Sequence, residues 1–247
     1  MTRIDRIRVP ERVRLDATTF LTWAAAFSGP KAARRGLRRC GAAAGPLFVS
    51  VFLIEGAKRP GYNPLRHPVS SLSLGPRGWV QAANFAIAGT LYLAGAAGLA
   101  RSPGQAACGR IAAAALGATG LGLLGSAAFR TDPVNGYPPG TPDTPAETTA
   151  TGAMHTVAAL PIFLGIPAAA LTCAWRFYRD GRPGWATYSA ATGASMLTTT
   201  GLFSAGLSQA PQLVNHAGLF QRATIVTGFS WLTALSVRAP LSNSRRP

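Results

Sequence analysis

The sequence predicts an all-α fold: an integral membrane bundle of six transmembrane helices with an extracytoplasmic cap formed by its loops. Three observations lead to this prediction. Apolar residues make up 48% of the 247 residues and charged residues only 13%, and the apolar residues occur in long runs, as in membrane proteins. Six of these runs approach the roughly 20 residues that a helix needs to cross a bilayer. The segments between them alternate between short connections and long, polar ones.

Each apolar run is uncharged through its middle, so each can form a helix that satisfies its own backbone hydrogen bonds inside lipid. The first run, with the sequence AAAGPLFVSVFLIE, is short, whereas the second is continuous and apolar. The predicted spans are 40–55, 80–99, 111–129, 154–174, 185–206 and 216–237.

Small and helix-bending residues distinguish the third and fourth spans. The third carries Ala118, Gly122 and Ser126 at four-residue spacing, and small residues at that spacing let helices pack closely. The fourth contains Pro161 and Pro167. We expect these prolines to bend the helix and to free backbone carbonyl groups, which favours a cavity beside it.

The fifth span carries a polar stripe. Tyr188, Thr192, Ser195 and Thr199 follow one another at intervals of four, three and four residues, which places them on one face of a helix. Such a stripe should turn inward, either to hydrogen-bond to neighbouring helices or to line a cavity.

The chain is predicted to have three parts. Residues 1–39 form an Arg-rich cytoplasmic tail, disordered or interfacial, although an over-extended start codon is an alternative interpretation of this segment. Residues 40–238 form the six-helix transmembrane domain, and residues 239–247 form a short second cytoplasmic tail. The charged leader before the first apolar run is too long for a cleaved secretory signal.

The distribution of basic residues predicts the orientation. Of the 24 Lys and Arg residues, ten precede residue 40. If the N-terminus is cytoplasmic, the inner segments hold 18 basic residues and the outer segments six, so both termini are predicted to lie in the cytoplasm. Without the tail the counts are eight and six, so most of the signal comes from the tail.

The net charge of +16 also bears on partners. In a soluble protein it would suggest nucleic acid, but basic residues gathered at one end of an apolar chain are more typical of contact with anionic lipids. We therefore expect the lipid bilayer of the cell membrane as partner, with anionic lipids bound through the tail, and no nucleic acid. The oligomeric state is left open.

Cysteines agree with this orientation. Cys40, Cys108 and Cys173 all fall on the predicted cytoplasmic side, so no structural disulfide is expected. No C-x-x-C pair exists that would indicate a thiol metal site.

The side chains that could bind a ligand or take part in catalysis gather on the predicted outer face. The three outer loops, 59–75, 129–148 and 208–222, contain or adjoin all three histidines and most of the acids outside the tail. Pro-Gly, Asn-Pro, Asp-Pro and Asn-Gly pairs in the first two loops predict tight turns and a compact cap. The candidate ligand-binding residues are His67, Asp132, His155, His216, Arg222, Glu55 and Ser70.

These residues suggest two kinds of reactive site, a zinc site and a nucleophilic site. His67, His155, His216 and Asp132 could supply three protein ligands for zinc and leave a position open for water. Ser70 or Ser71 with a histidine and an aspartate could instead form a nucleophilic site. The chain has no H-E-x-x-H and no G-x-S-x-G, and single histidines at helix ends are more often structural. The catalytic residues, if any, are not identified.

Glu55 and Arg222 each lie at the outer end of a predicted span, at partial membrane depth. Burying an ionisable group there costs free energy unless the group is paired or hydrated. We therefore expect a Glu55–Arg222 ion pair between the first and sixth spans. The alternative is that Arg222 anchors an anionic head group.

Four segments resemble a known family. They are YNPLRHPVSSLSLGPRGWVQAANF, FRTDPVNGYP, the GAMH at 152–155, and NHAGLFQR before the sixth span. In order and spacing they are similar to the domain-of-unknown-function 998 family of bacterial and archaeal membrane proteins, over about residues 43–237. The resemblance implies six spans and no assigned activity, and it carries over no catalytic residues.

These observations favour a membrane protein that binds a lipid head group or a small polar ligand at its extracytoplasmic face. The alternatives are a membrane-embedded metal-dependent hydrolase that uses the outer-face His and Asp residues, and a small-solute transporter. Against a transporter, no span carries an acid at its middle or forms a broken-helix pair.

Overall fold

The computed structural model describes residues 30–102, 107–144 and 147–237. The prediction of an all-α fold is confirmed: helices account for 78% of the structure, and no strand occurs among the described residues. The chain divides at residues 33 and 34 into two units. The described part of the second unit contains every candidate site residue and all of the helical bundle except the first residues of its first helix.

Six helical rods correspond in order to the six predicted spans. The helices are α2 (Pro30–Lys58), α3 (Gly78–Ala100), α4 (Ala107–Ala128), α5 (Ala150–Leu160), α6 (Ile166–Arg179), α7 (Pro183–Leu207) and α8 (Ala217–Val237). A π-helical turn, η2 (Pro161–Gly165), joins α5 and α6 into one rod. Two short 3-10 helices, η1 (Val69–Ser73) and η3 (Val214–His216), lie in the connections.

The first rod begins earlier than predicted. Helix α2 starts at Pro30, ten residues before the expected start of the first span, so residues 30–39 of the predicted tail are helical. Arg38 in this part donates two hydrogen bonds to the backbone oxygen of Ser236, near the C-terminus of α8. A basic side chain there satisfies an end carbonyl of that helix. Residues 1–29 and 238–247 lie outside the described residues.

Among the described residues, four rods are long and apolar enough to cross a membrane: Lys31–Lys58, Gly78–Ala100, Ala107–Ala128 and Ala150–Arg179. Helices α7 and α8 have sufficient length but are not apolar enough to be counted with them. Serines and threonines along α7, and Gln221 and Arg222 in α8, lower their hydropathy. The apolar helices indicate a membrane protein, whereas the crossing of all six rods stays a prediction.

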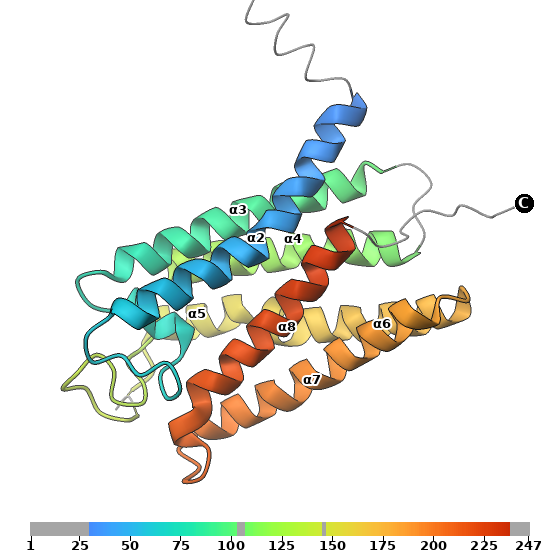
Figure 1. Cartoon of the computed structure of the whole chain (residues 1–247). Helices are drawn as coiled ribbons and strands as arrows, with labels where there is room; N and C mark the ends of the chain where they lie inside the picture. The colour runs from blue at the N-terminus through green and yellow to red at the C-terminus, as the bar shows by residue number, and fades with distance from the viewer. Residues whose placement is uncertain (1–29, 103–106, 145–146, 238–247) are drawn as a thin grey trace, which may run out of the picture. The chain divides into compact units, whose positions relative to one another are not determined.

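Close approaches between glycines bring α2, α3 and α4 together (Figure 1). A Cβ atom on Gly95 would lie 2.5 Å from the Cα atom of Gly41, and one on Gly89 would lie 2.8 Å from the carbonyl oxygen of Gly120. On α4, a Cβ atom on Gly122 would lie 2.5 Å from the carbonyl oxygen of Ala158 in α5. The predicted packing role of small residues in this span is therefore confirmed.

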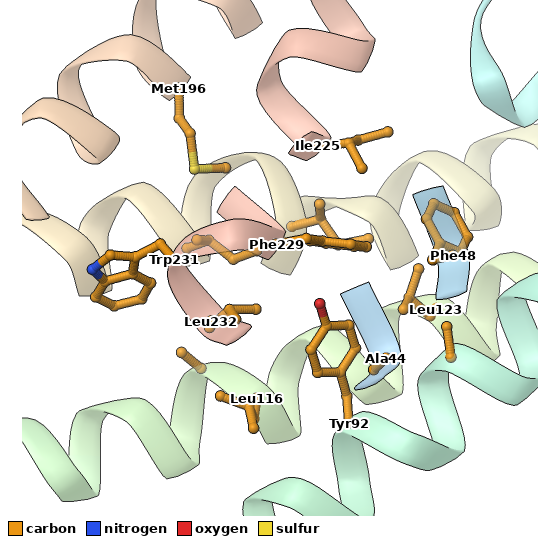
Figure 2. Close-up of a cluster of buried hydrophobic side chains, with 14 of the residues drawn as sticks. Ala44, Phe48, Tyr92, Leu116, Leu123, Met196, Ile225, Phe229, Trp231 and Leu232 are labelled. Atoms are coloured by element: carbon orange, nitrogen blue, oxygen red, sulfur yellow. The ribbon is translucent and has the colours of Figure 1, made fainter. Parts of the chain in front are cut away.

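The core of the bundle lies around α8. Figure 2 shows Phe229 of α8 between aromatic rings of α2 and α3, with centroid distances of 5.5 Å to Phe48 and 5.2 Å to Tyr92. Trp231, also on α8, is fully buried, and its indole nitrogen donates to the hydroxyl of Ser189 in α7 at 3.0 Å. Burying that donor next to an acceptor avoids the cost of an unsatisfied polar group.

The predicted polar stripe on α7 is only partly turned inward. Thr192 is buried, and Thr199 shares a 2.6 Å hydrogen bond with Thr224 of α8. Tyr188 and Ser195 are exposed. The stripe therefore joins α7 to α8 through Thr199 instead of forming a continuous lining.

Aromatic side chains mark both ends of the bundle. Trp79, at the start of α3, is 70% exposed, and Trp175 and Tyr178 are exposed near the opposite end, in α6. The guanidinium carbons of Arg176 and Arg179 lie 5.0 and 5.2 Å from the centroid of the Trp175 ring. Exposed aromatic and basic residues at helix ends are typical of membrane interfaces.

The described parts of the three long connections lie at one end of the bundle, whereas the C-terminus of α3, the N-terminus of α4 and the α6–α7 connection lie at the other (Figure 1). We call the three long connections the cap. The cap comprises the described parts of 59–77, 129–149 and 208–216. The three connections meet in space through the hydrogen bonds described next.

Candidate functional site

Arg66 holds the three connections of the cap together. It lies in the first connection, and its Nη2 atom bonds to the carboxylate of Asp143 in the second at 2.7 Å. Its Nε atom donates to the backbone oxygen of Asn135 at 3.1 Å, and its Nη1 atom donates to the side chain of Asn215 in the third connection. The carboxamide of Asn135 returns a bond to the backbone oxygen of Arg66 and accepts one from Gln209 at 2.8 Å.

A second arginine, Arg59, organises the link from α2 to α3. Its guanidinium group is buried and binds the carboxylate of Glu55, one turn earlier, at 2.7 Å. Its remaining donors reach the backbone oxygens of Leu72, Leu74 and Arg77 at 3.0–3.2 Å. Irregular backbone carries carbonyl groups that need partners when buried, and one guanidinium supplies several donors for them.

The predicted Glu55–Arg222 ion pair is wrong. Glu55 binds Arg59 and Arg77, the latter at 2.8 Å. Arg222 instead donates to the backbone oxygens of Pro64, His67 and Gly218 and to the hydroxyl of Tyr62. Arg59 is only one turn from Glu55 on the same helix face, so it neutralises the acid, and Arg222 fastens α8 to the first connection.

His67 is a structural residue of the cap. Its Nδ1 atom accepts a hydrogen bond from the backbone amide of Asn63 at 2.9 Å, and its ring packs against Tyr62 and Tyr137 at 5.4 and 5.2 Å. Burial lowers the pKa of His67 below its usual value, and the charges of Arg66 and Arg222 lower it further, against the opposing effects of Asn135 and Asp143. Burial also raises the pKa of Tyr62 to about 12. Both groups are therefore uncharged near neutral pH.

A cavity of about 470 Å³ lies beneath the cap. Its roof comes from Pro68–Ser70 of the first connection and from Thr131, Asp132 and Val134 of the second. Its walls come from helices of the bundle and the π-helical turn. The wall residues are Phe48, Phe85, Leu123, Ser126, Gly152, His155, Thr156, Ala159, Leu160, Ile162, Phe163, Leu164, Thr200, Phe203, Ser204, Leu207, Gln221, Ile225 and Phe229, and Thr148 also contacts it.

The cavity contains three of the predicted site residues: Ser70, Asp132 and His155. The carboxylate of Asp132 accepts bonds from the backbone amide and the hydroxyl of Thr149, at 3.1 and 2.6 Å. Thr149 is the N-cap of α5 and accepts from the amide of Gly152 at 3.0 Å. Asp132 thus lies at the positive end of the α5 dipole.

His155 lies one turn further along α5. It is 5% exposed, and its Nδ1 atom lies 2.8 Å from the backbone oxygen of Phe129 at the end of α4. The edge of its ring contacts Phe85, with centroids 6.0 Å apart. The carbonyl of Phe129 therefore orients the imidazole, whose ring forms part of the cavity wall.

The other predicted residues lie elsewhere. His67 is buried in the cap, Glu55 is buried at the end of α2, Arg222 is partly buried near the start of α8, and His216 is exposed at the end of η3. In the described parts of the chain, no three His, Cys, Asp or Glu side chains are grouped so that they could hold a metal ion. His67, His155, His216 and Asp132 are thus not brought together as one ligand set.

Sequence reasoning missed Gln221 as a residue of the cavity. It lies on α8, is 4% exposed, and its Oε1 atom accepts from the backbone amide of Val69 in the roof at 2.6 Å. The signal was present, because a carboxamide inside an apolar span should face the interior of a bundle. Thr200 was also missed; its buried hydroxyl has no hydrogen-bond partner among the described residues.

The irregularity expected from the prolines of the fourth span is confirmed. The π-helical turn begins at Pro161, which has no amide hydrogen to continue the α-helical ladder. Ile162, Phe163 and Leu164 of this turn line the cavity. Such turns often occur at functional sites, and here the turn directs three apolar side chains to one wall.

Replacing Glu55 by alanine should destabilise the protein strongly. The change leaves the Arg59 guanidinium buried without its counter-charge, which costs about 3–5 kcal/mol of unfolding free energy. Thermal unfolding in detergent, followed by circular dichroism, measures the effect. The Asp143→Asn variant is the control, because its carboxylate is 56% exposed and an exposed ion pair contributes about 0–1 kcal/mol. Equal losses in the two variants would contradict this description of the cap.

The cap should lose stability as the pH falls. Folded His67 resists protonation, so below about pH 6.5 the unfolded chain binds the proton first, and stability that is complete above this pH decreases below it. In the His67→Asn variant the amide oxygen can still accept from Asn63 but does not titrate. We expect the melting temperature of this variant to fall less between about pH 7.5 and 5.5 than that of the wild type. Parallel profiles for wild type and His67→Asn would refute the assignment.

Comparison with known proteins places the chain in a family. The family model described as protein of unknown function (DUF998) matches residues 42–238. No curated protein and no solved structure matches the chain significantly. The matched segment contains the cap, the cavity and nearly all of the six rods that follow from the apolar runs of the sequence. The chain therefore belongs to the DUF998 family of proteins of unknown function.

Proposed function

We propose that this protein is a six-span protein of the cell membrane, with both termini in the cytoplasm, that binds an amphiphile from the bilayer in the cavity beneath its cap. The cavity is the observation that carries the proposal. Its roof includes the polar residues Ser70, Thr131 and Asp132, and its helical walls are largely apolar. Such a mixture suits a molecule with a polar end and an apolar chain. Ligand pockets in proteins have volumes of roughly 300–1,000 Å³.

The lengths of α7 and α8 support six crossings. Helix α8 has 21 residues and α7 has 25, which correspond to about 32 and 38 Å, against about 30 Å of hydrocarbon. Several of the polar groups that lower their hydropathy are turned toward other helices: Gln221 is buried, and Thr199 bonds to Thr224. Leu197 and Val226 remain exposed, as lipid-facing residues would be.

The contacts of the basic residues support the orientation with the cap outside the cell. Of the six basic residues on the cap side, Arg59, Arg66, Arg77 and Arg222 all donate to groups of the protein itself. Arg176 and Arg179 at the opposite end are exposed, and basic residues close to an anionic leaflet contribute on the order of 1 kcal/mol each. We place the cap outside and assign anionic lipids to the other end, together with the Arg-rich tail.

Reporter fusions test this topology. A fusion at residue 140 should be active only for a periplasmic or extracellular reporter, and a fusion after residue 247 only for a cytoplasmic one, because the positive-inside rule retains the basic end. A cytoplasmic signal at residue 140 would overturn the orientation.

The walls of the cavity favour entry from the side. The connections that form the roof are bonded to one another and to α8 through Arg66 and Arg222. Leu160 and Leu164 of the α5–η2 wall are 45% and 53% exposed. Helix α7 packs against η2, where the rings of Phe163 and Phe203 stack at 5.7 Å, but it makes little or no contact with α5. The ligand would therefore pass between α5 and α7 from the lipid.

Filling the cavity should abolish lipid retention. Ala159 lines the cavity on α5, so Ala159→Phe places a ring inside it. Native mass spectrometry of the protein released from detergent should show a bound amphiphile on the wild type and about tenfold less on the variant, because overlap with a filled site prevents binding.

The matched control is Ala153→Phe. Ala153 lies on the same helix, is exposed, and does not line the cavity, so this variant should retain the amphiphile. Equal retention by both variants would overturn the cavity as the binding site. Equal melting temperatures would confirm that the two folds are comparable.

A further inference from the structure

Charge is distributed unevenly around the cavity. Among the described residues that line it, Asp132 is the one acid, and no Lys or Arg is present. Arg59, Arg66 and Arg222 direct their guanidinium groups to acceptors of the protein. Arg130 precedes the roof segment but is exposed and does not line the cavity. An anionic head group would therefore meet a carboxylate with no adjacent cation, and like charges in contact are unfavourable.

Asp132 has acceptor capacity to spare. An ionised carboxylate offers about four lone-pair sites, and the amide and hydroxyl of Thr149 occupy two of them. The carboxylate lies directly against α5 at Gly152. It is so close to this residue that a Cβ atom there would overlap its Oδ2 atom. The glycine thus allows the acid to reach the helix face that the cavity shares.

His155 presents a second acceptor. The backbone oxygen of Phe129 can only accept, so the Nδ1 atom of His155 is the donor in their 2.8 Å contact. In the neutral ring, Nε2 then carries the lone pair. Gly152 and His155 are three residues apart on α5, so they lie on the same face. The carboxylate of Asp132 and the imidazole of His155 are therefore about one turn apart along one wall.

We propose that the polar end of the ligand is a hydrogen-bond donor without negative charge, an aliphatic alcohol or amine, and that it binds between Asp132 and His155. The apolar chain lies along the wall formed by α5, η2 and α7, where Leu160, Phe163 and Phe203 line the cavity. This inference rests on the proposed function and specifies its ligand. It replaces the expectation that Arg222 holds an anionic head group.

Three probes with the same chain length test the inference. Radiolabelled 1-dodecylamine, 1-dodecanol and dodecanoate are titrated onto the full-length protein in nanodiscs of zwitterionic lipid, and specific binding is defined as the part lost in Ala159→Phe. We expect the amine and the alcohol to bind at least about tenfold more tightly than dodecanoate, because a hydrogen bond to a charged group corresponds to roughly that factor.

The variant Asp132→Asn separates charge from shape. It should weaken specific binding of the amine by about tenfold, reduce that of the alcohol less, and leave dodecanoate no weaker than in the wild type. Glu147→Gln serves as the control. Glu147 is an exposed acid of the second connection and does not line the cavity, so this variant should leave the amine-to-dodecanoate preference in place.

The outcomes distinguish the two proposals. If dodecanoate binds as tightly as the amine and Ala159→Phe removes both, the assignment of the polar end is overturned while the cavity remains the site. If Ala159→Phe removes no binding of any probe, both proposals fall. Should Asp132→Asn not fold, the ranking of the three probes on the wild type decides alone.

Discussion

The guanidinium groups of Arg59, Arg66 and Arg222 bind the backbone carbonyl groups of connections that have little regular secondary structure of their own. A loop at the edge of a membrane has fewer water molecules to satisfy its carbonyl groups, and an unsatisfied buried carbonyl is costly. An arginine offers five donors in a rigid plane. Each of these arginines thus converts a segment of irregular chain into a fixed surface.

The cavity depends on that surface. Its roof is made of residues that adjoin the arginine-bound segments, and Gln221 of α8 holds the roof at the amide of Val69. Glu55 balances the buried charge of Arg59, and the guanidinium groups of Arg66 and Arg222 are likewise bonded to acceptors of the protein. This explains how a protein with a net charge of +16 can have a cavity whose lining, among the described residues, contains an acid and no Lys or Arg.

Helix α5 joins the roof to the walls. Its N-terminus is capped by Thr149, which in turn binds Asp132, so the acid is positioned by the start of the helix. Further along the same helix, His155 is oriented by the end of α4. The rod then changes to a π-helical turn at Pro161. Phe163 of this turn lies in the cavity wall, where its ring stacks on that of Phe203 from α7. The polar pair Asp132 and His155 at one end and the aromatic pair Phe163 and Phe203 further along give the cavity its amphiphilic character.

The sequence by itself determined the helical class, the order of the rods, the three-connection cap and the proline-induced irregularity, because hydropathy runs and turn residues act locally. It also indicated Ser70, Asp132 and His155, since they lie in or beside polar connections. The Glu55–Arg59 pair follows from a four-residue spacing along the chain. Only the tertiary structure decided that Glu55 also binds Arg77, that His67 is enclosed by two tyrosines, and that Gln221 reaches the roof. Ion-pair partners and cavity linings depend on distances between segments that are far apart in the chain, and no local pattern encodes those distances.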